Sequence, residues 1–104
     1  MAHKIVIADD EPNILISLDY LMKREGHEVV LARTGDEALE AIRREKPTLV
    51  LLDVMMPGKS GHEVLAALRA DEAQAAQRGD ASRGHTLVLM LSAKGRDTDV
   101  AKGL

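Results

Sequence analysis

The feature that most constrains the fold is a run of four apolar residues that ends in a carboxylate. Leu49 to Leu52 lead directly into Asp53, and the turn residues Pro57 and Gly58 follow shortly afterwards. A short apolar run bounded by turn residues is typical of a strand buried on both faces, as in a parallel sheet covered by helices. Ligands of such sheets bind beyond the carboxyl ends of the strands. The run therefore predicts a central strand that carries a functional acid.

The remaining elements alternate between strand and helix. Pro12 marks one helix start, and capping boxes mark two others, from Thr34 to Glu37 and from Ser60 to Glu63. We expect strands over residues 4–8, 27–32, 48–53 and 86–91, each followed by a helix, the last over residues 96–104. This order predicts an α/β fold with right-handed crossovers, a flavodoxin-like doubly wound parallel sheet with strand order 2-1-3-4.

Residues 71–84 interrupt the apolar periodicity. They contain no apolar residue larger than Ala and are rich in Ala, Gln, Asp and Gly. We therefore expect the third helix to fray after Ala70 and residues 79–84 to form an exposed loop.

Length and composition exclude several classes of protein. A chain of 104 residues has room for one domain. The net charge of −3 and a single aromatic residue, Tyr20, argue against direct nucleic-acid contact. The absence of cysteine excludes disulfides and thiolate metal sites. No apolar run approaches the roughly 20 residues that cross a bilayer, and no signal peptide precedes the first strand, so we expect a cytoplasmic protein without membrane contact.

Polar residues follow three of the four predicted strands. Asp9 and Asp10 follow the first, Asp53 ends the third and Ser92 follows the fourth. If the first and third strands are neighbours, the three carboxylates meet and repel each other unless a proton or a cation is bound. An anionic cluster of oxygen ligands selects a hard ion such as Mg²⁺, which would also neutralise charge during phosphoryl transfer. A carboxylate here can be the nucleophile and form an aspartyl phosphate.

Three motifs lie at these strand ends: IVIADDEP from Ile5 to Pro12, LLDVMMPG from Leu51 to Gly58, with Gly61 beyond, and LSAK from Leu91 to Lys94. Together, in this βα alternation, they resemble the receiver domain of bacterial two-component response regulators. The resemblance covers the whole chain, residues 1–104. It implies a phosphorylation-dependent signalling switch rather than a turnover enzyme, with at most modest self-phosphorylation and autodephosphorylation.

The resemblance also implies roles for individual residues. Asp53 would be the phospho-acceptor, and Mg²⁺ would be held by Asp9, Asp10, Asp53 and the backbone carbonyl of Met55. Ser92 would be the switch hydroxyl that moves toward the phosphoryl group. The phosphate donor would be a phosphohistidine on a sensor histidine kinase or a phosphotransfer protein. The sequence identifies neither the cognate kinase nor the downstream effector.

One departure from the family concerns the C-terminal end. Family members carry a Lys at the end of a fifth strand, followed by a final helix, whereas this sequence stops at Leu104. Lys94 lies two residues after Ser92 and does not substitute for that Lys. We expect either a C-terminally incomplete receiver domain or a domain without a fifth βα unit. In the second case the fourth strand is an apolar edge, which predicts a dimer through strand four or helix four.

Other roles remain open for the same residues. The acids after the first strand could cap the first helix, Asp53 could form a turn, and Ser92 could satisfy a backbone group. The side chains of Met55 and Met56 are expected to pack. The alternative functions are a Mg²⁺-dependent phosphohydrolase, which would need an acid where Met55 stands, and an adaptor that takes no phosphate.

Overall fold

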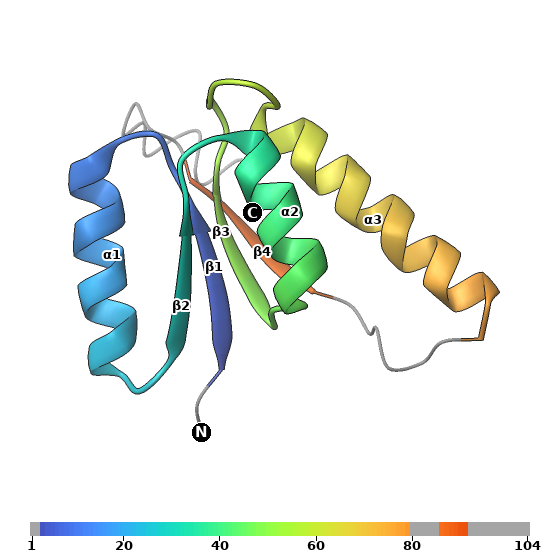
Figure 1. The fold of residues 1–104 in the computed structure, drawn as a ribbon, viewed down its shortest axis with the longest axis horizontal. Coiled ribbons are helices and arrows are strands. Elements are labelled where there is room, and N and C mark those ends of the chain that lie inside the picture. Colours follow the sequence, from blue (N-terminus) through green and yellow to red (C-terminus); the bar gives the residue numbers. More distant parts are fainter. Residues whose placement is uncertain (1–2, 80–85, 92–104) are drawn as a thin grey trace.

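A computed structural model describes residues 3–79 and 86–91. These ranges form one sheet flanked by helices (Figure 1). The strands are β1 (Lys4–Ala8), β2 (Glu28–Ala32), β3 (Leu49–Asp53) and β4 (Leu87–Leu91), and the helices are α1 (Pro12–Arg24), α2 (Gly35–Glu45) and α3 (Gly61–Gln77). None of these helices is both long and apolar enough to cross a membrane. Ser92 and the predicted helix over residues 96–104 lie outside the described residues.

The sheet is parallel throughout these strands, with the order β2-β1-β3-β4. Ala8 of β1 pairs with Ala32 of β2 on one side and with Leu52 of β3 on the other, so all three strands end at the same edge. The predicted doubly wound fold and its strand order are confirmed. Chain order reverses between β1 and β3, which is where sheets of this kind bind ligands.

The sheet buries a different set of side chains on each face. Helix α1 covers the face that carries Ile5 and Leu51, whereas α2 and α3 cover the face that carries Val6 and Leu52 (Figure 1). Successive side chains of a strand point to opposite faces, so a strand covered on both faces needs an apolar residue at every position. This requirement explains the unbroken apolar run in β3.

Two of the helices begin at the side-chain caps that the sequence predicts. The Thr34 hydroxyl accepts a hydrogen bond from the Glu37 N–H at 3.1 Å at the start of α2. At the start of α3 the cap is reciprocal: the Glu63 N–H donates to the Ser60 hydroxyl at 3.2 Å, and the Ser60 N–H donates to Glu63 at 2.9 Å. These caps satisfy backbone donors that a helix start leaves without partners.

Helix α3 continues to Gln77, so it is longer than the sequence predicts. The prediction that this helix frays after Ala70 is wrong. Ala75 is only 2% exposed, so a single methyl group is enough for close packing there. Glu72 accepts a hydrogen bond from the Thr86 N–H at 2.7 Å, and Arg69 donates to the Thr86 carbonyl at 2.9 Å. These contacts tie the second half of α3 to the residue before β4. Of the loop predicted over residues 79–84, all but the first residue lie outside the described ranges.

Strand β4 lies at the end of the sheet and is the least buried strand. Leu87 and Leu89 are 64% and 45% exposed. Within the described part of the chain, β4 pairs only with β3. An apolar strand at such a position is open to pairing with another chain.

Candidate functional site

Three carboxylates meet at the carboxyl ends of β1 and β3. Asp53 is the last residue of β3, and Asp9 and Asp10 follow β1 directly. One oxygen from each of these side chains lies within 4.8 Å of the others. Asp9 and Asp53 are fully buried, whereas Asp10 is exposed. The structure thus brings together the three acids whose convergence the sequence predicts, because β1 and β3 are neighbours in register.

Each buried carboxylate is oriented by a backbone N–H two residues further along the chain. The Glu11 N–H donates to Asp9 Oδ1 at 2.8 Å, and the Met55 N–H donates to Asp53 Oδ1 at 3.3 Å. The second oxygens, Asp9 Oδ2 and Asp53 Oδ2, are buried without a hydrogen-bond partner among the described residues. Buried polar atoms usually have a partner, so these two oxygens are available to a cation or a proton.

The alternative role of these acids as helix caps has support only at Asp9. Glu11 occupies the N-cap position of α1, and its side chain makes no capping hydrogen bond. Asp9 Oδ1 accepts from the N–H of this N-cap residue, so it satisfies one backbone donor at the start of α1 and still has Oδ2 without a partner among the described residues. Pro12, with no N–H of its own, begins α1 and lowers the need for a cap.

The environment of the acid cluster raises the pKa of Asp53. The pKa of Asp53 is raised from 3.8 to about 6, first by burial and then by the charge of Asp9, with a smaller effect from Asp10. The Met55 N–H opposes this change because it stabilises the ionised carboxylate. A bound divalent cation would relieve the repulsion and favour the ionised form. The residues present fit a hard metal ion, because the cluster offers only oxygen ligands.

The start of α3 lies close against the carboxyl end of β3. The Gly61 N–H donates to the Val54 carbonyl at 2.8 Å, and a Cβ at Gly61 would collide with the backbone carbonyl of Asp53. Glycine is therefore required for α3 to start there. The side chain of Met56 packs against the core, as predicted, but the prediction is wrong for Met55, which is 65% exposed. The metal-binding role of the Met55 carbonyl stays a prediction.

Strand β4 ends beside the acid cluster. Leu91 is the register partner of Asp53, and its carbonyl accepts a hydrogen bond from the Val54 N–H at 3.1 Å. Ser92 comes next in the sequence but lies outside the described residues. Its role as a switch hydroxyl therefore stays a prediction.

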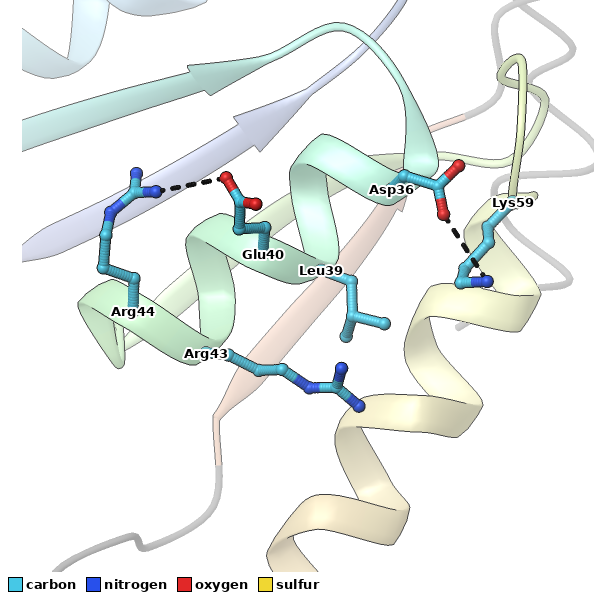
Figure 2. Close-up of a pocket in the computed structure, with 6 residues that line it drawn as sticks. All are labelled: Asp36, Leu39, Glu40, Arg43, Arg44 and Lys59. Carbon is cyan, nitrogen blue, oxygen red and sulfur yellow. Dashed lines mark ion pairs between the residues drawn. The ribbon is translucent and has the colours of Figure 1, made fainter.

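A groove of about 540 Å³ lies between α2 and the start of α3 (Figure 2). It is lined by Asp36, Leu39, Glu40, Arg43, Arg44 and Lys59, and by none of the three acids of the cluster. Its cations are paired with acids: Lys59 with Asp36 at 3.5 Å, Arg44 with Glu40 at 3.5 Å, and Arg43 with Asp71 at 2.8 Å. These internal pairs leave little unbalanced charge to attract a ligand.

Two residues near the site were missed by reasoning from the sequence. Gly35 begins α2, and its N–H donates to the Pro57 carbonyl at 3.2 Å in the loop after β3. Lys59 forms the ion pair with Asp36 that is drawn in Figure 2. Glycine is a poor helix former, so its presence at the first position of α2 could have indicated that another segment approaches the backbone there.

Comparisons with known proteins identify the family. The family model described as the response regulator receiver domain matches residues 5–104. The chain is similar to the BeF3-activated N-terminal receiver domain of RstA from Klebsiella pneumoniae, at 31% identity and a TM-score of 0.72, over 92% of this chain and 72% of that one. It is also similar to the N-terminal domain of a response regulator receiver protein from Methanoculleus marisnigri JR1, at 33% identity and a TM-score of 0.74, over 97% and 75%.

The family match and the geometry agree. The matched range contains the three acids, and a pocket of this kind is typical of response regulators that switch on phosphorylation. Receiver domains interact with histidine kinases or phosphotransfer proteins. The resemblance inferred from the motifs at the strand ends is therefore confirmed. The chain belongs to the response regulator receiver domain family of two-component systems.

Proposed function

We propose that Asp53 is the phospho-acceptor and that Mg²⁺ is held by Asp9, Asp10, Asp53 and the backbone carbonyl of Met55. The observation that carries this proposal is the pair of buried oxygens, Asp9 Oδ2 and Asp53 Oδ2, that lack a partner among the described residues. Mg²⁺ typically uses one or two carboxylates, keeps several waters and bridges to phosphate oxygens. A cluster with two buried acids and one exposed acid suits that coordination.

The environment of Asp53 supports its choice as the nucleophile. Its Oδ1 accepts from the Met55 N–H, which orients the carboxylate. Its pKa of about 6 makes it more basic than an ordinary aspartate, yet it is largely ionised at neutral pH. A carboxylate that is both ionised and basic is well placed to attack phosphorus.

The transfer itself is a simple displacement. One oxygen of the Asp53 carboxylate forms a bond to the phosphorus of a phosphohistidine while the P–N bond breaks, and the imidazole nitrogen keeps the electron pair and takes a proton from solvent. A Mg²⁺ ion held by Asp9, Asp10, Asp53 and the Met55 carbonyl would neutralise charge on the phosphoryl oxygens. The product is an aspartyl phosphate, and attack by water on it gives slow autodephosphorylation.

The new phosphoryl group acts as the signal. It adds about two negative charges beside the end of β4, because Leu91 is the register partner of Asp53. We propose that the Ser92 hydroxyl donates to a phosphoryl oxygen and that this contact shifts the end of β4 between two arrangements, which alters a partner surface. We propose a sensor histidine kinase or a phosphotransfer protein as the phosphate donor, and the cytoplasm as the location of the domain.

Beryllofluoride, the activator named for the Klebsiella pneumoniae receiver domain, provides a direct test. With Mg²⁺ present, we expect a one-to-one adduct by mass spectrometry or fluorine NMR, and one phosphoryl group per chain from acetyl phosphate. Asp53→Asn should abolish both adducts. Asp19→Asn, at a carboxylate on α1 paired with Lys23, is the matched control and should retain them. Multiple turnover would indicate a hydrolase, and no adduct would indicate an adaptor.

We further propose that the chain dimerises through β4, which within residues 3–79 and 86–91 forms an edge of the sheet and exposes Leu87 and Leu89. Backbone pairing across such an edge is the usual route of strand-mediated association. Light scattering at increasing concentration should show a dimer, and Leu89→Lys should return it to a monomer. A wild-type chain that stays monomeric at high concentration contradicts this proposal. The predicted alternative through the fourth helix falls outside the described residues.

A further inference from the structure

The loop between β3 and α3 rests on the first turn of α2. The Gly35 N–H donates to the Pro57 carbonyl at 3.2 Å. The two backbones are so close that a Cβ on Gly35 would collide with the carbonyl group of Lys59. The contact is thus one of backbone against backbone, and no side chain can rotate away to relieve a collision there.

A second pair of contacts joins the same two segments. Gly58 adopts a positive φ of 78°, and a Cβ there would lie 2.6 Å from Asp36 Oδ2. Lys59 Nζ lies 3.5 Å from Asp36 Oδ1, and Figure 2 shows the two side chains facing each other. The start of α2 therefore holds the loop at Pro57 and at Lys59, and it leaves no room for a side chain at Gly58 between them.

The opposite end of the same loop carries the proposed metal ligand. The Met55 N–H donates to Asp53 Oδ1 at 3.3 Å, so the peptide at Met55 is already tied to the acid cluster. Only Met56 separates Met55 from Pro57, whose carbonyl the first turn of α2 holds. Few rotatable backbone angles lie between the two carbonyls, because the peptide units are planar and the proline ring fixes the φ of Pro57. A displacement at Pro57 is therefore passed on to the Met55 carbonyl.

We propose that the first turn of α2, through Gly35 and the Asp36–Lys59 ion pair, positions the Met55 carbonyl for the metal ion. This inference rests on the proposed function, because it concerns the geometry of the proposed Mg²⁺ site. Groups that orient metal ligands commonly control metal affinity without touching the ion. Gly35, Asp36 and Lys59 are positioning residues in this sense. By linkage, the bound ion must in turn strengthen the contact between the loop and α2.

Gly35→Ala is the sharpest test of the proposal. Alanine is a better helix former than glycine, so α2 itself should not suffer, and the defect is confined to the collision with Lys59. We expect the Mg²⁺ affinity measured by titration calorimetry to fall about tenfold, the scale of lost ligand orientation. Far-ultraviolet circular dichroism should show that the variant remains folded.

Gly26→Ala is the matched control. Gly26 has a positive φ of 91°, and a Cβ there would meet nothing within 4 Å. The change should therefore lower stability through backbone strain alone, at the opposite end of α1 from the acid cluster. We expect unchanged Mg²⁺ affinity. A fall equal to that of Gly35→Ala would show that general destabilisation is responsible, and it would overturn the proposal.

Lys59→Gln tests the ion pair by the sign of its effect. Removing a cation near an acidic pocket should strengthen Mg²⁺ binding if charge alone matters. Loosening the loop should weaken it instead, by about twofold, the scale of an exposed ion pair. Weaker binding supports positioning by α2, and unchanged or stronger binding overturns the role of this pair. If Gly35→Ala does not fold, the result for Lys59→Gln decides the proposal.

The failure of this inference can be told apart from the failure of the proposed function. A wild-type protein that binds no Mg²⁺ contradicts the proposed site itself. A wild-type protein that binds Mg²⁺, together with a folded Gly35→Ala variant of equal affinity, overturns only the positioning role. Amide hydrogen exchange adds an independent readout, because Mg²⁺ should slow exchange at the Gly35 N–H.

Discussion

The charged groups at the two ends of the sheet differ in whether they are paired. At the carboxyl end, Asp9 and Asp53 are fully buried, carry like charges and leave two oxygens without partners among the described residues. At the amino end, Glu72 pairs with Arg69 at 2.8 Å and accepts from the Thr86 N–H at 2.7 Å. At the carboxyl end the acids repel each other. At the amino end Glu72 is neutralised by Arg69 and satisfies a backbone N–H.

This contrast separates the end of the sheet that would bind a cation from the end that stabilises the fold. The acid cluster raises the free energy of the metal-free protein, and a cation recovers that free energy when it binds. At the opposite end, Glu72 and Arg69 already have each other as partners and therefore do not need a ligand to balance their charges. We therefore expect perturbations of the two ends to change stability with opposite signs.

The largest expected effect concerns pH and Asp53. Its pKa is higher in the folded protein, so folding is favoured while it holds its proton, and this advantage disappears as the pH rises from 3.8 to about 6. In Asp53→Asn the side chain stays neutral. The variant should therefore gain stability over the metal-free wild type by about 3 kcal/mol between pH 4 and pH 7. Urea denaturation followed by circular dichroism measures this difference.

Magnesium provides the control for that prediction. Adding Mg²⁺ at pH 7 should stabilise the wild type and narrow the gap to Asp53→Asn, because the ion neutralises the repulsion. At pH 4 the same addition should have little effect, since Asp53 is then largely protonated. If the difference in the free energy of unfolding between the two proteins does not change with pH, the ionised acids of the cluster do not repel each other appreciably.

A smaller change of opposite sign is expected at the amino end. Burial raises the pKa of Glu72, but the Thr86 N–H and Arg69 outweigh it, so the pKa is lowered overall. Its stabilising effect is therefore complete above pH 4.5 and is lost as the pH falls through the folded pKa. Glu72→Ala should lower the free energy of unfolding by about 2 kcal/mol at pH 7, because it leaves the Thr86 N–H, in a buried residue, without its acceptor.

The Glu72→Ala variant also tests whether the two ends are independent. Its Mg²⁺ affinity should equal that of the wild type, because sites far apart with no shared partner add independently. Glu40→Ala, at an exposed residue on α2, is the matched control and should change neither stability nor affinity. A loss of Mg²⁺ affinity in Glu72→Ala alone would show that α3 couples the two ends.

The smallest effect is expected for the pair of Lys4 and Glu45 at the amino end. Their charged groups lie 3.0 Å apart, but both side chains remain partly exposed to solvent. Water screens such a pair, and ordering two side chains opposes it. Lys4→Met should leave the denaturation midpoint within experimental error. A clear loss of stability would show that balanced charge matters at the surface as well as around Glu72.

Much of this molecule follows from local patterns in the sequence. The apolar run before Asp53 is bounded by turn residues, and Ser60 and Thr34 mark their helix starts, because strand burial and helix capping depend on a few neighbouring residues. The meeting of Asp9 with Asp53 also follows, since parallel strands present their carboxyl ends at one edge. The acid cluster was therefore predictable before any coordinates.

Contacts between segments distant in the sequence were decided only by the tertiary structure. The second half of α3 has no apolar stripe, and it is helical because Ala75 is buried and Glu72 accepts a hydrogen bond from the Thr86 N–H just before β4. The contact of Gly35 with Lys59 depends on how α2 and the loop after β3 are placed on the sheet. A sequence pattern records the needs of one element, whereas these contacts depend on the relative position of two.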